Sequence, residues 1–348
     1  MDTPTLAFAS LPDRIEDKTH LEDLLSRPPE ALVEDLARLD GDIIVLGVAG
    51  KVGPTLARMA KRAAPDKRVV GVARFSDADV RRRLESWGVE TIACDLLDRE
   101  AVEALPKIRN VVYMAGKKFG TAGDEPFTWA MNAYVPALVA EAYRDSRIVA
   151  FSTLCVYPYA PFNTEGWDES VPPDPPGAYA NSCVARERLF QYFSRLHGTP
   201  GRLMRLNYAI ETRYGVLVDV ASWVRNGEPI PIGTSRASVI WQGEASAQML
   251  RAFHHCTVPA SPLNIGGPQA FSIRTLARMF GERFGREPIF AGEDAEAGWI
   301  NDTSQSQRLF GMPIVPVTLM VDWVADWLER GLPLHHKPTK YEERSGRF

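Results

Sequence analysis

One short segment constrains the fold more than any other part of this chain. The apolar run Asp42-Ile-Ile-Val-Leu46 leads directly into Gly47-Val-Ala-Gly50-Lys-Val-Gly53, and a helix is predicted to follow over residues 55–64. Three glycines at this spacing permit a tight turn and let backbone N–H groups approach a pyrophosphate, to which the start of the helix adds its positive dipole end. We therefore expect a dinucleotide on this loop. The residues expected to hold it are Gly47, Gly50, Lys51, Val52 and Gly53.

Apolar strands alternate with helical segments after the loop. The expected strands are 68–73, 90–94, 110–114, 147–151 and 202–206, with helices at 80–87 and 179–197. This rhythm predicts right-handed βαβ units and a parallel sheet that is covered on both faces. The expected fold class is α/β: a Rossmann-type doubly wound parallel sheet of about seven strands with a smaller C-terminal substrate lobe.

The length of 348 residues exceeds that of one usual compact core. Leucines at helical spacing between Leu21 and Leu39 predict an N-terminal helical extension, which we place at residues 1–40. Residues 41–205 are expected to form the NAD(P)-binding Rossmann domain, with sheet-completing segments later in the chain. Residues 206–348 are expected to form mainly the substrate-binding lobe and the C-terminal tail.

The composition excludes several classes of partner. A formal net charge of −4 gives no basic footprint for nucleic acid, and no apolar run is long enough to cross a bilayer. The N-terminus lacks the basic and apolar regions of a secretion signal, so we expect a cytoplasmic protein. The four cysteines are scattered and form no CxxC pair, so we expect no metal site.

The end of the second strand bears on the choice of cofactor. An acidic residue there would bind the adenosine ribose hydroxyls and favour NAD, whereas an arginine can pair with a 2′-phosphate. The chain has Ala73 followed by Arg74. We expect NADP or NAD, with NADP preferred, although Arg74 as a solvated surface residue remains an alternative.

The GxxGxxG spacing of the loop resembles that of the extended short-chain dehydrogenase/reductase family, the NAD-dependent epimerase/dehydratase group. The resemblance covers about Gly41 to Gly331 and includes Cys94-Asp95-Leu96 after the third strand and Met114-Ala-Gly-Lys-Lys118 after the fourth. It implies that Asp95 and Leu96 contact adenine and that the second loop passes the cofactor. The further cofactor-binding residues that it implies are Met114, Ala115, Gly116, Lys118 and the helix asparagine Asn132.

The segment Phe151-Ser-Thr-Leu-Cys-Val-Tyr157 resembles the family's Ser-Ser-x-x-Val-Tyr-Gly run. This register implies that Thr153 and Tyr179 are catalytic. Arg205-Leu-Asn207 resembles the family's substrate-contacting Arg-x-x-Asn region, one residue shorter, and the implied substrate-binding residues are Ser152 and Asn207. The resemblance further implies hydride transfer at a hydroxyl or carbonyl of a sugar or sugar nucleotide, and a homodimer formed by the helices that contain Asn132 and residues 179–197.

One departure from the family pattern concerns the chemistry itself. The family signature is Tyr-x-x-x-Lys, and here Tyr179 is followed by Cys183 in the lysine position. A tyrosine with a pKa near 10 is a poor base, and lowering that pKa costs about 1.4 kcal/mol per unit, which a neutral thiol does not supply.

Three interpretations follow from this departure. In the first, Arg186 or the loop lysines Lys117 and Lys118 supply the missing positive charge. In the second, Tyr179 stays neutral and polarises a carbonyl together with Thr153. In the third, the protein is a catalytically degenerate NAD(P)-binding regulatory or scaffold protein. Cys183 as a nucleophile is the weaker alternative, because the sequence supplies no histidine partner for it.

Overall fold

The computed structural model describes residues 5–118, 120, 123–337 and 339–346. The first four residues of the expected extension lie outside this range, as do residues 119 and 121–122 and, in the expected tail, residues 338 and 347–348.

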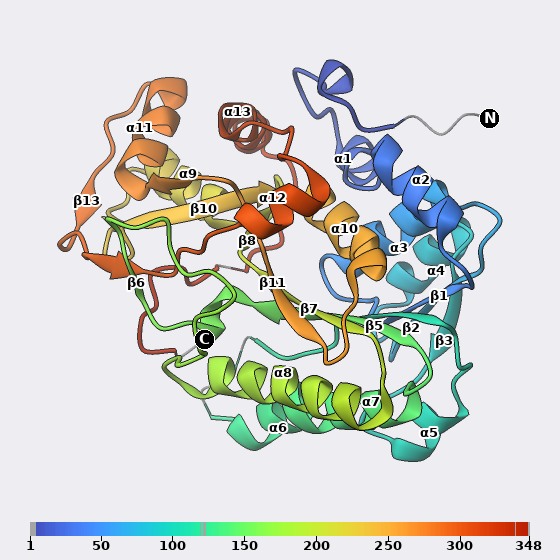
Figure 1. Ribbon diagram of the computed structural model, residues 1–348. Coiled ribbons are helices and arrows are strands. Elements are labelled where there is room, and N and C mark those ends of the chain that lie inside the picture. The colour runs from blue at the N-terminus through green and yellow to red at the C-terminus, as the bar shows by residue number, and fades with distance from the viewer. Residues whose placement is uncertain (1–4, 119, 121–122, 338, 347–348) are drawn as a thin grey trace.

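Seven parallel strands form the central sheet in the order β11-β7-β5-β4-β1-β2-β3 (Figure 1). The strands are β1 Ile43–Leu46, β2 Val69–Ala73, β3 Glu90–Ala93, β4 Asn110–Tyr113, β5 Arg147–Thr153, β7 Gly201–Leu206 and β11 Ser261–Ile265. The expected fold class is thereby confirmed. The strand order reverses between β1 and β4, and ligands of such sheets bind at the carboxyl ends of the strands beside that reversal.

Helices cover both faces of this sheet, as Figure 1 shows. One face carries α2, α3, α4 and α10, whose apolar side chains share a core with Ile43 and Val45 of β1. The other carries α5, α6, α7 and α8, and its core includes Ile44 and Leu46. The bounds are α2 Glu30–Arg38, α3 Gly53–Ala63, α4 Ala78–Ser86, α5 Arg99–Ala104, α6 Glu125–Trp129, α7 Val135–Ala142, α8 Ala178–His197 and α10 Gln242–Arg251, with a π-helical turn at Ala130–Tyr134. Alternate β1 side chains therefore serve opposite cores, as a sheet buried on both faces requires.

The C-terminal lobe contains short strands and four helices around a core of its own. A three-stranded sheet has the order β12-β10-β8, and the pairs β13-β9 and β14-β6 complete the lobe. The strands are β6 Ala160–Pro161, β8 Tyr208–Ile210, β9 Ile230–Pro231, β10 Arg236–Trp241, β12 Ala270–Ser272, β13 Phe290–Ala291 and β14 Ala297–Gly298. The helices are α9 Val216–Asn226, α11 Ile273–Phe284, α12 Ser304–Phe310 and α13 Val317–Glu329, and 3-10 turns lie at Phe8–Ser10, Leu154–Val156 and Ala252–His255. Buried Trp241, Trp323 and Trp327 anchor this core.

The N-terminal extension packs against both parts of the molecule. It forms α1, Lys18–Leu25, and α2, between which Pro28 and Pro29 interrupt the helical run. Leu21 and Leu24 of α1 are buried in the core of the C-terminal lobe. Leu32 and Leu36 of α2 are buried against the central sheet instead. The extension therefore joins the two cores.

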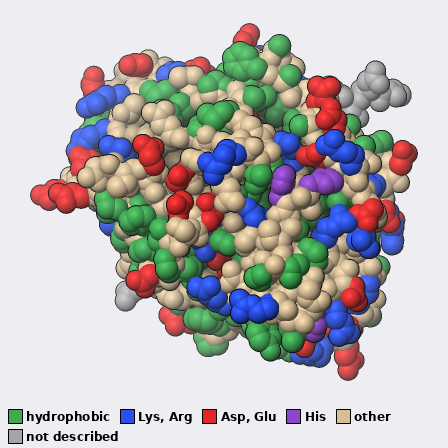
Figure 2. Space-filling view, viewed as in Figure 1, with side chains coloured by type: hydrophobic (Ala, Val, Ile, Leu, Met, Phe, Trp, Pro, Cys, Tyr) green, Lys and Arg blue, Asp and Glu red, His purple; other side chains and the backbone are tan. Residues whose placement is uncertain are grey.

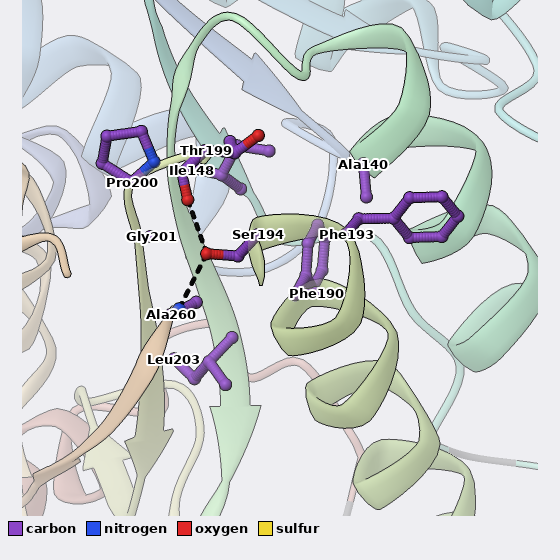
Figure 3. A pocket seen from close by; sticks show the side chains of 10 residues that line it. All are labelled: Ala140, Ile148, Phe190, Phe193, Ser194, Thr199, Pro200, Gly201, Leu203 and Ala260. Carbon is purple, nitrogen blue, oxygen red and sulfur yellow. Dashed lines mark hydrogen bonds between the residues drawn. The ribbon is translucent and has the colours of Figure 1, made fainter. Parts of the chain in front are cut away.

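The C-terminal half of α8 is fixed to the edge of the central sheet (Figure 3). Phe190 packs edge-on against Tyr113 of β4, with ring centroids 5.2 Å apart. The Ser194 hydroxyl donates to the Thr199 carbonyl at 2.6 Å and accepts from the Ala260 N–H at 2.8 Å. These contacts hold the helix whose first half carries Tyr179 and Cys183.

Candidate active site

The backbone of the glycine loop is closely packed at Gly47 and Gly53 and faces open space at Gly50. Gly47 has φ +91°, and a Cβ there would lie 2.6 Å from the backbone nitrogen of Ala115. A Cβ on Gly53 would lie 2.1 Å from the Val48 carbonyl oxygen, so this glycine permits the close contact between strand and helix. The nearest atom to a Cβ on Gly50 is 3.7 Å away. The loop therefore presents its backbone to open space at Gly50, where a ligand can approach it.

Two cavities lie beside this loop. The first, of about 300 Å³, is lined by Lys51 and Val52 of the loop and by residues from both parts of the molecule. The second, of about 460 Å³, is lined by Ala49, Gly50 and Lys51 together with α4 and the C-terminal segment. Lys51 lines both cavities. A dinucleotide has two halves joined by a pyrophosphate. These residues fit an arrangement in which each cavity receives one half and the loop between them receives the pyrophosphate.

The structure brings half of the predicted site residues together in the first cavity. Those that line it are Lys51, Val52, Met114, Gly116, Lys118, Ser152, Thr153, Tyr179 and Asn207. They come from the loops after β1 and β4, from the end of β5, from α8 and from the residue that follows β7. This is the convergence at the carboxyl ends of the strands that the fold predicts.

Other predicted residues lie outside the described lining of both cavities. Arg74 is exposed at the end of β2. Asp95 is also exposed and accepts the Leu97 N–H at 3.1 Å, while Leu96 is buried in the core below the sheet. Ala115 packs under Gly47, and Cys183 is completely buried behind the cavity. Asn132 is completely buried and lines neither cavity.

Tyr179 is held in its neutral form. Its hydroxyl interacts with the thiol of Cys183, four residues further along the same helix. Burial, reinforced by Cys183 and Cys155, raises the pKa of Tyr179 well above its ordinary value, and Arg186 opposes this only in part. Burial likewise raises the pKa of Cys183, so the pair is a phenol beside a thiol. Such a phenol can donate a hydrogen bond but is a poor base at neutral pH.

Arg186 brings a buried positive charge to the wall of the cavity. It lies one helical turn beyond Cys183, and it donates from Nη1 to the Phe151 carbonyl at 2.9 Å and from Nη2 to Asn132 Oδ1 at 2.8 Å. Burial acts to lower the pKa of Arg186, but Cys183 and nearby tyrosines raise it overall. Its Nε is buried and has no hydrogen-bond partner among the described residues, while the residue as a whole contributes to the lining of the first cavity.

Asn132 connects the loop after β4 to α8. It lies in the π-helical turn, a feature that often marks functional positions. Its Oδ1 accepts from the Lys117 N–H at 2.9 Å as well as from Arg186, and its Nδ2 donates to the Lys117 carbonyl at 2.9 Å and to Ser182 Oγ at 3.0 Å. This buried side chain therefore orients the backbone that presents Lys118.

The two loop lysines differ in their surroundings. Lys117 forms an ion pair with Asp124 at 2.6 Å, so its charge is directed away from the tyrosine. Lys118 is directed into the cavity, and its Nζ donates to the Thr339 carbonyl at 3.4 Å. Burial lowers the pKa of Lys118. Of the two, Lys118 is the one that reaches the site.

The resemblance of Arg205 to a substrate-contacting arginine is not matched by its position. Arg205 is buried below the cavity, where Nε and Nη2 donate to the two carboxylate oxygens of Glu187 at 3.0 and 2.8 Å. Glu187 also accepts from Ser152 Oγ at 2.6 Å, so this ion pair supports the end of β5. Only Asn207 of the Arg205–Asn207 pair lines the cavity, where its Nδ2 donates to Asn301 at 2.8 Å.

Sequence reasoning missed the C-terminal contribution to the site. Tyr214 and Gln242 line the first cavity, and so does Thr339 of the tail. Thr339 is buried because its backbone N–H donates to Asp219 Oδ2 at 2.8 Å. No periodic pattern marks these residues, so only the fold brings them to the cavity.

Two further features are absent from the described parts of the chain. No helix there is long and apolar enough to cross a membrane. Residues 5–118, 120, 123–337 and 339–346 contain no group of three or more His, Cys, Asp or Glu side chains that could hold a metal ion.

Residues 43–213 match the family model described as the NAD dependent epimerase/dehydratase family. The phenolphthiocerol synthesis polyketide synthase type I Pks15/1 of Mycobacterium marinum is 32% identical over 112 residues, which are 28% of this chain and 5% of that protein. The chain thus spans only a small fraction of the length of that curated relative.

Two solved structures illustrate the similarity in fold. The UDP-glucose 4-epimerase of Thermus thermophilus, solved with NAD, is 18% identical with a TM-score of 0.67, covering 83% of this chain and 99% of that one. The UDP-glucuronic acid 4-epimerase of Bacillus cereus, solved with UDP-glucuronic acid and NAD, is 18% identical with a TM-score of 0.70 and the same coverage. At this identity the likeness concerns the fold alone.

Proposed function

Because the chain belongs to the NAD dependent epimerase/dehydratase family, we propose that it binds a nicotinamide dinucleotide and catalyses hydride transfer at a hydroxyl or carbonyl of a sugar or sugar nucleotide. The observation that carries this proposal is the meeting of Thr153 and Tyr179 in one cavity beside the open glycine loop. Similar folds have been solved with UDP-sugars and NAD, which supports the substrate class.

The chain's own residues would hold the cofactor in a defined order. The loop at Gly50 and the start of α3 would receive the pyrophosphate, with Met114, Gly116 and Lys118 along the half nearest Tyr179. When bound, the nicotinamide ring accepts or returns a hydride. Arg186 lines the same side of the cavity and brings a positive charge to its wall.

The role that we propose for Tyr179 is that of a neutral donor. Its raised pKa favours hydrogen bonding to a carbonyl oxygen over removal of a hydroxyl proton. Thr153 lines the same cavity and offers a second hydroxyl to that oxygen. This arrangement favours the second interpretation of the Cys183 departure, with Arg186 as the nearest permanent positive charge. It suits the reduction of a carbonyl better than the oxidation of a hydroxyl.

A second candidate function is that of a catalytically degenerate dinucleotide-binding protein with a regulatory or scaffold role. Cys183 favours it, because the thiol supplies no charge and is itself completely buried. The two functions share the same cofactor site. They differ in whether Tyr179 and Thr153 act on a substrate.

The choice between NADP and NAD stays a prediction. The preference for NADP depended on Arg74, which is exposed and outside the described lining of both cavities. Carboxylates of Asp77 and Asp79 line the second cavity beside Gly50, and acidic side chains there suit ribose hydroxyls. Titration with each dinucleotide decides between the two cofactors.

We also propose a homodimer formed through α6, the π-helical turn and α8. Large apolar side chains are exposed on these elements, namely Trp129, Tyr134, Tyr192 and Leu196. Figure 2 shows apolar side chains at the lower edge of the molecule, where Figure 1 places α6 and α8. Sedimentation of the wild type and of Tyr192→Glu tests this assembly. The expected cytoplasmic location stays a prediction, which the four free thiols favour.

The function itself is tested with the purified full chain. Calorimetric titration with NAD and NADP measures binding, and incubation with a panel of UDP-sugars and their keto forms is followed by reduced-nicotinamide absorbance and by chromatography of the sugars. Turnover of any of them supports the enzyme. Tight dinucleotide binding without turnover supports the degenerate binding protein, and failure to bind either dinucleotide overturns both.

A further inference from the structure

The segment 339–346 folds back onto the molecule and begins at the first cavity. Thr339 is buried and lines that cavity, and its backbone N–H donates to Asp219 Oδ2 of α9 at 2.8 Å. From the loop after β4, the Nζ of Lys118 donates to the Thr339 carbonyl at 3.4 Å. Thr339 therefore forms a wall of the cavity that contains Tyr179, between this loop and the C-terminal lobe.

The residues after Thr339 fasten the segment to the C-terminal lobe. Tyr341 is completely buried in the core of the lobe, and its hydroxyl donates to the Pro231 carbonyl of β9 at 2.9 Å. Arg344 donates from Nη1 to the carbonyls of Gly233 and Ala297 at 3.1 and 2.7 Å. The segment is therefore held along β9 and β14 by a buried ring and by bonds to the backbone.

The same segment also contacts the part of the chain that leads into α8. The hydroxyl of Tyr159 donates to the Arg344 carbonyl, and the guanidinium of Arg344 lies 4.2 Å from the Tyr159 ring centroid, a favourable cation–π distance. Gly346 is buried against Gly177, where a Cβ would lie 2.7 Å from the Gly346 Cα. Gly177 comes two residues before Tyr179. The segment thus connects the C-terminal lobe to the start of α8, beside Tyr179.

This connection limits the space that a substrate can occupy. The first cavity measures about 300 Å³, which is at the lower end of the range of roughly 300–1,000 Å³ for ligand pockets. Under the proposed function it holds the nicotinamide end of the cofactor as well as the substrate. A sugar ring beside Tyr179 and Thr153 meets the wall at Thr339. A nucleotide attached to that ring would need the space beyond the wall, where Tyr341 and Arg344 lie.

We propose that residues 339–346 form a strap that closes the substrate side of the first cavity and selects a sugar without a nucleotide over a nucleotide-linked sugar. This inference rests on the proposed function and names its substrate class. A nucleotide-linked sugar enters only when the strap is displaced, so its apparent affinity falls with the fraction of molecules in which the strap is open. A free sugar needs no such displacement, because its ring lies inside the wall.

The open fraction of the strap can be measured without any assay of function. Trypsin cleaves after Lys340, and cleavage of a transiently opened segment follows the population of its open form. Arg344→Ala removes two hydrogen bonds to backbone carbonyls and the contact with Tyr159, so cleavage after Lys340 should become about tenfold faster. Mass spectrometry of the cleaved full chain gives the rate. Arg278→Ala is the matched control, since Arg278 is exposed on α11 of the same lobe.

Calorimetric titration with UDP-glucose connects the strap to specificity. The full chain is first saturated with NAD or NADP, whichever binds more tightly. Arg344→Ala should then bind UDP-glucose about tenfold more tightly than the wild type and Arg278→Ala. The affinity for the dinucleotide should be unchanged, because Arg344 is outside the described lining of both cavities. In the wild type, saturating UDP-glucose should speed cleavage after Lys340, since the occupied site holds the strap open.

Three results would overturn the proposal. The first is equal affinity for UDP-glucose in Arg344→Ala and the wild type, including no binding by either protein. The second is cleavage after Lys340 that Arg344→Ala does not accelerate. The third is protection of Lys340 by UDP-glucose, which would mean that the segment closes over a nucleotide-linked sugar. Wild-type protein that binds neither NAD nor NADP would instead overturn the proposed function.

Discussion

The guanidinium of Arg186 donates to Oδ1 of Asn132 across 2.8 Å, which joins α8 to the π-helical turn. The same oxygen accepts the backbone N–H of Lys117, so one amide side chain couples a buried charge to the loop that carries Lys118. In a family whose signature places a lysine at position 183, this pair positions a cation without that lysine.

Replacement of Arg186 tests this coupling. Arg186→Met should lower the free energy of unfolding by about 1–3 kcal/mol, because the Phe151 carbonyl and Asn132 Oδ1 lose a buried donor. It should also weaken dinucleotide binding by about tenfold or more, since the wall of the cavity loses a positive charge. Urea unfolding and calorimetric titration measure the two effects.

Arg188→Met provides the matched control for Arg186→Met. Arg188 lies on the same helix, but it is exposed and bonds only to Gln191 in the described structure. Unchanged binding in Arg186→Met, with stability reduced as expected, would limit Arg186 to a structural role.

The pH dependence of turnover tests the neutral state of Tyr179. Because burial raises the pKa of this phenol well above its ordinary value, deprotonation does not begin near neutrality. A lysine-assisted tyrosine would titrate between pH 6 and 9. If Tyr179 is neutral, we expect kcat/KM of the wild type to show no rise over this range that depends on the Tyr179 hydroxyl. Comparison with Tyr179→Phe shows whether any rise depends on it. Tyr179→Phe should fold normally and lose about 10²- to 10⁴-fold in turnover. A rising limb that vanishes with the hydroxyl would show that Tyr179 acts as a base.

Restoring the family lysine gives a further test. Cys183→Lys would place an ammonium group in a completely buried position beside the charge of Arg186. Two adjacent buried cations repel, so the single variant should be less stable and less active than the wild type. Cys183→Lys combined with Arg186→Ala should recover part of both, and thermal unfolding with kinetics measures this coupling. Higher activity in the single variant would instead show that the missing lysine limits the wild-type site.

Local sequence patterns predicted the structure correctly, whereas contacts between residues far apart in the sequence were missed. The strand 43–46 and its glycine loop are local, and a buried apolar run before GxxGxxG allows few other folds, so the central sheet was predicted correctly. The hydrogen bond between Arg186 and Asn132 joins residues 54 positions apart, and no periodic sequence pattern predicts such a contact. The buried ion pair of Arg205 with Glu187 likewise joins residues 18 positions apart, and no sequence pattern indicated it. Thr339 reaches the cavity only because the tail folds back onto Asp219.

The three glycines of the loop offer a prediction that separates folding from binding. A methyl group at position 53 would lie 2.1 Å from a carbonyl oxygen of the backbone, whereas at position 50 the nearest atom is 3.7 Å away. Gly53→Ala should therefore lower the free energy of unfolding by several kcal/mol, about the cost of overpacking a core, and reduce the soluble yield. Gly50→Ala should leave stability within about 1 kcal/mol of the wild type, since its methyl group meets open space.

Binding should show the opposite order. In Gly50→Ala the added methyl group stands between the loop backbone and a pyrophosphate, so affinity for NAD or ADP-ribose should fall at least tenfold although the protein stays folded. Urea unfolding and calorimetric titration of the two variants, with wild type beside them, give both quantities. Full affinity in a folded Gly50→Ala protein would mean that the dinucleotide does not approach the loop at this position, and the site of the pyrophosphate would then have to be sought elsewhere along the strand ends.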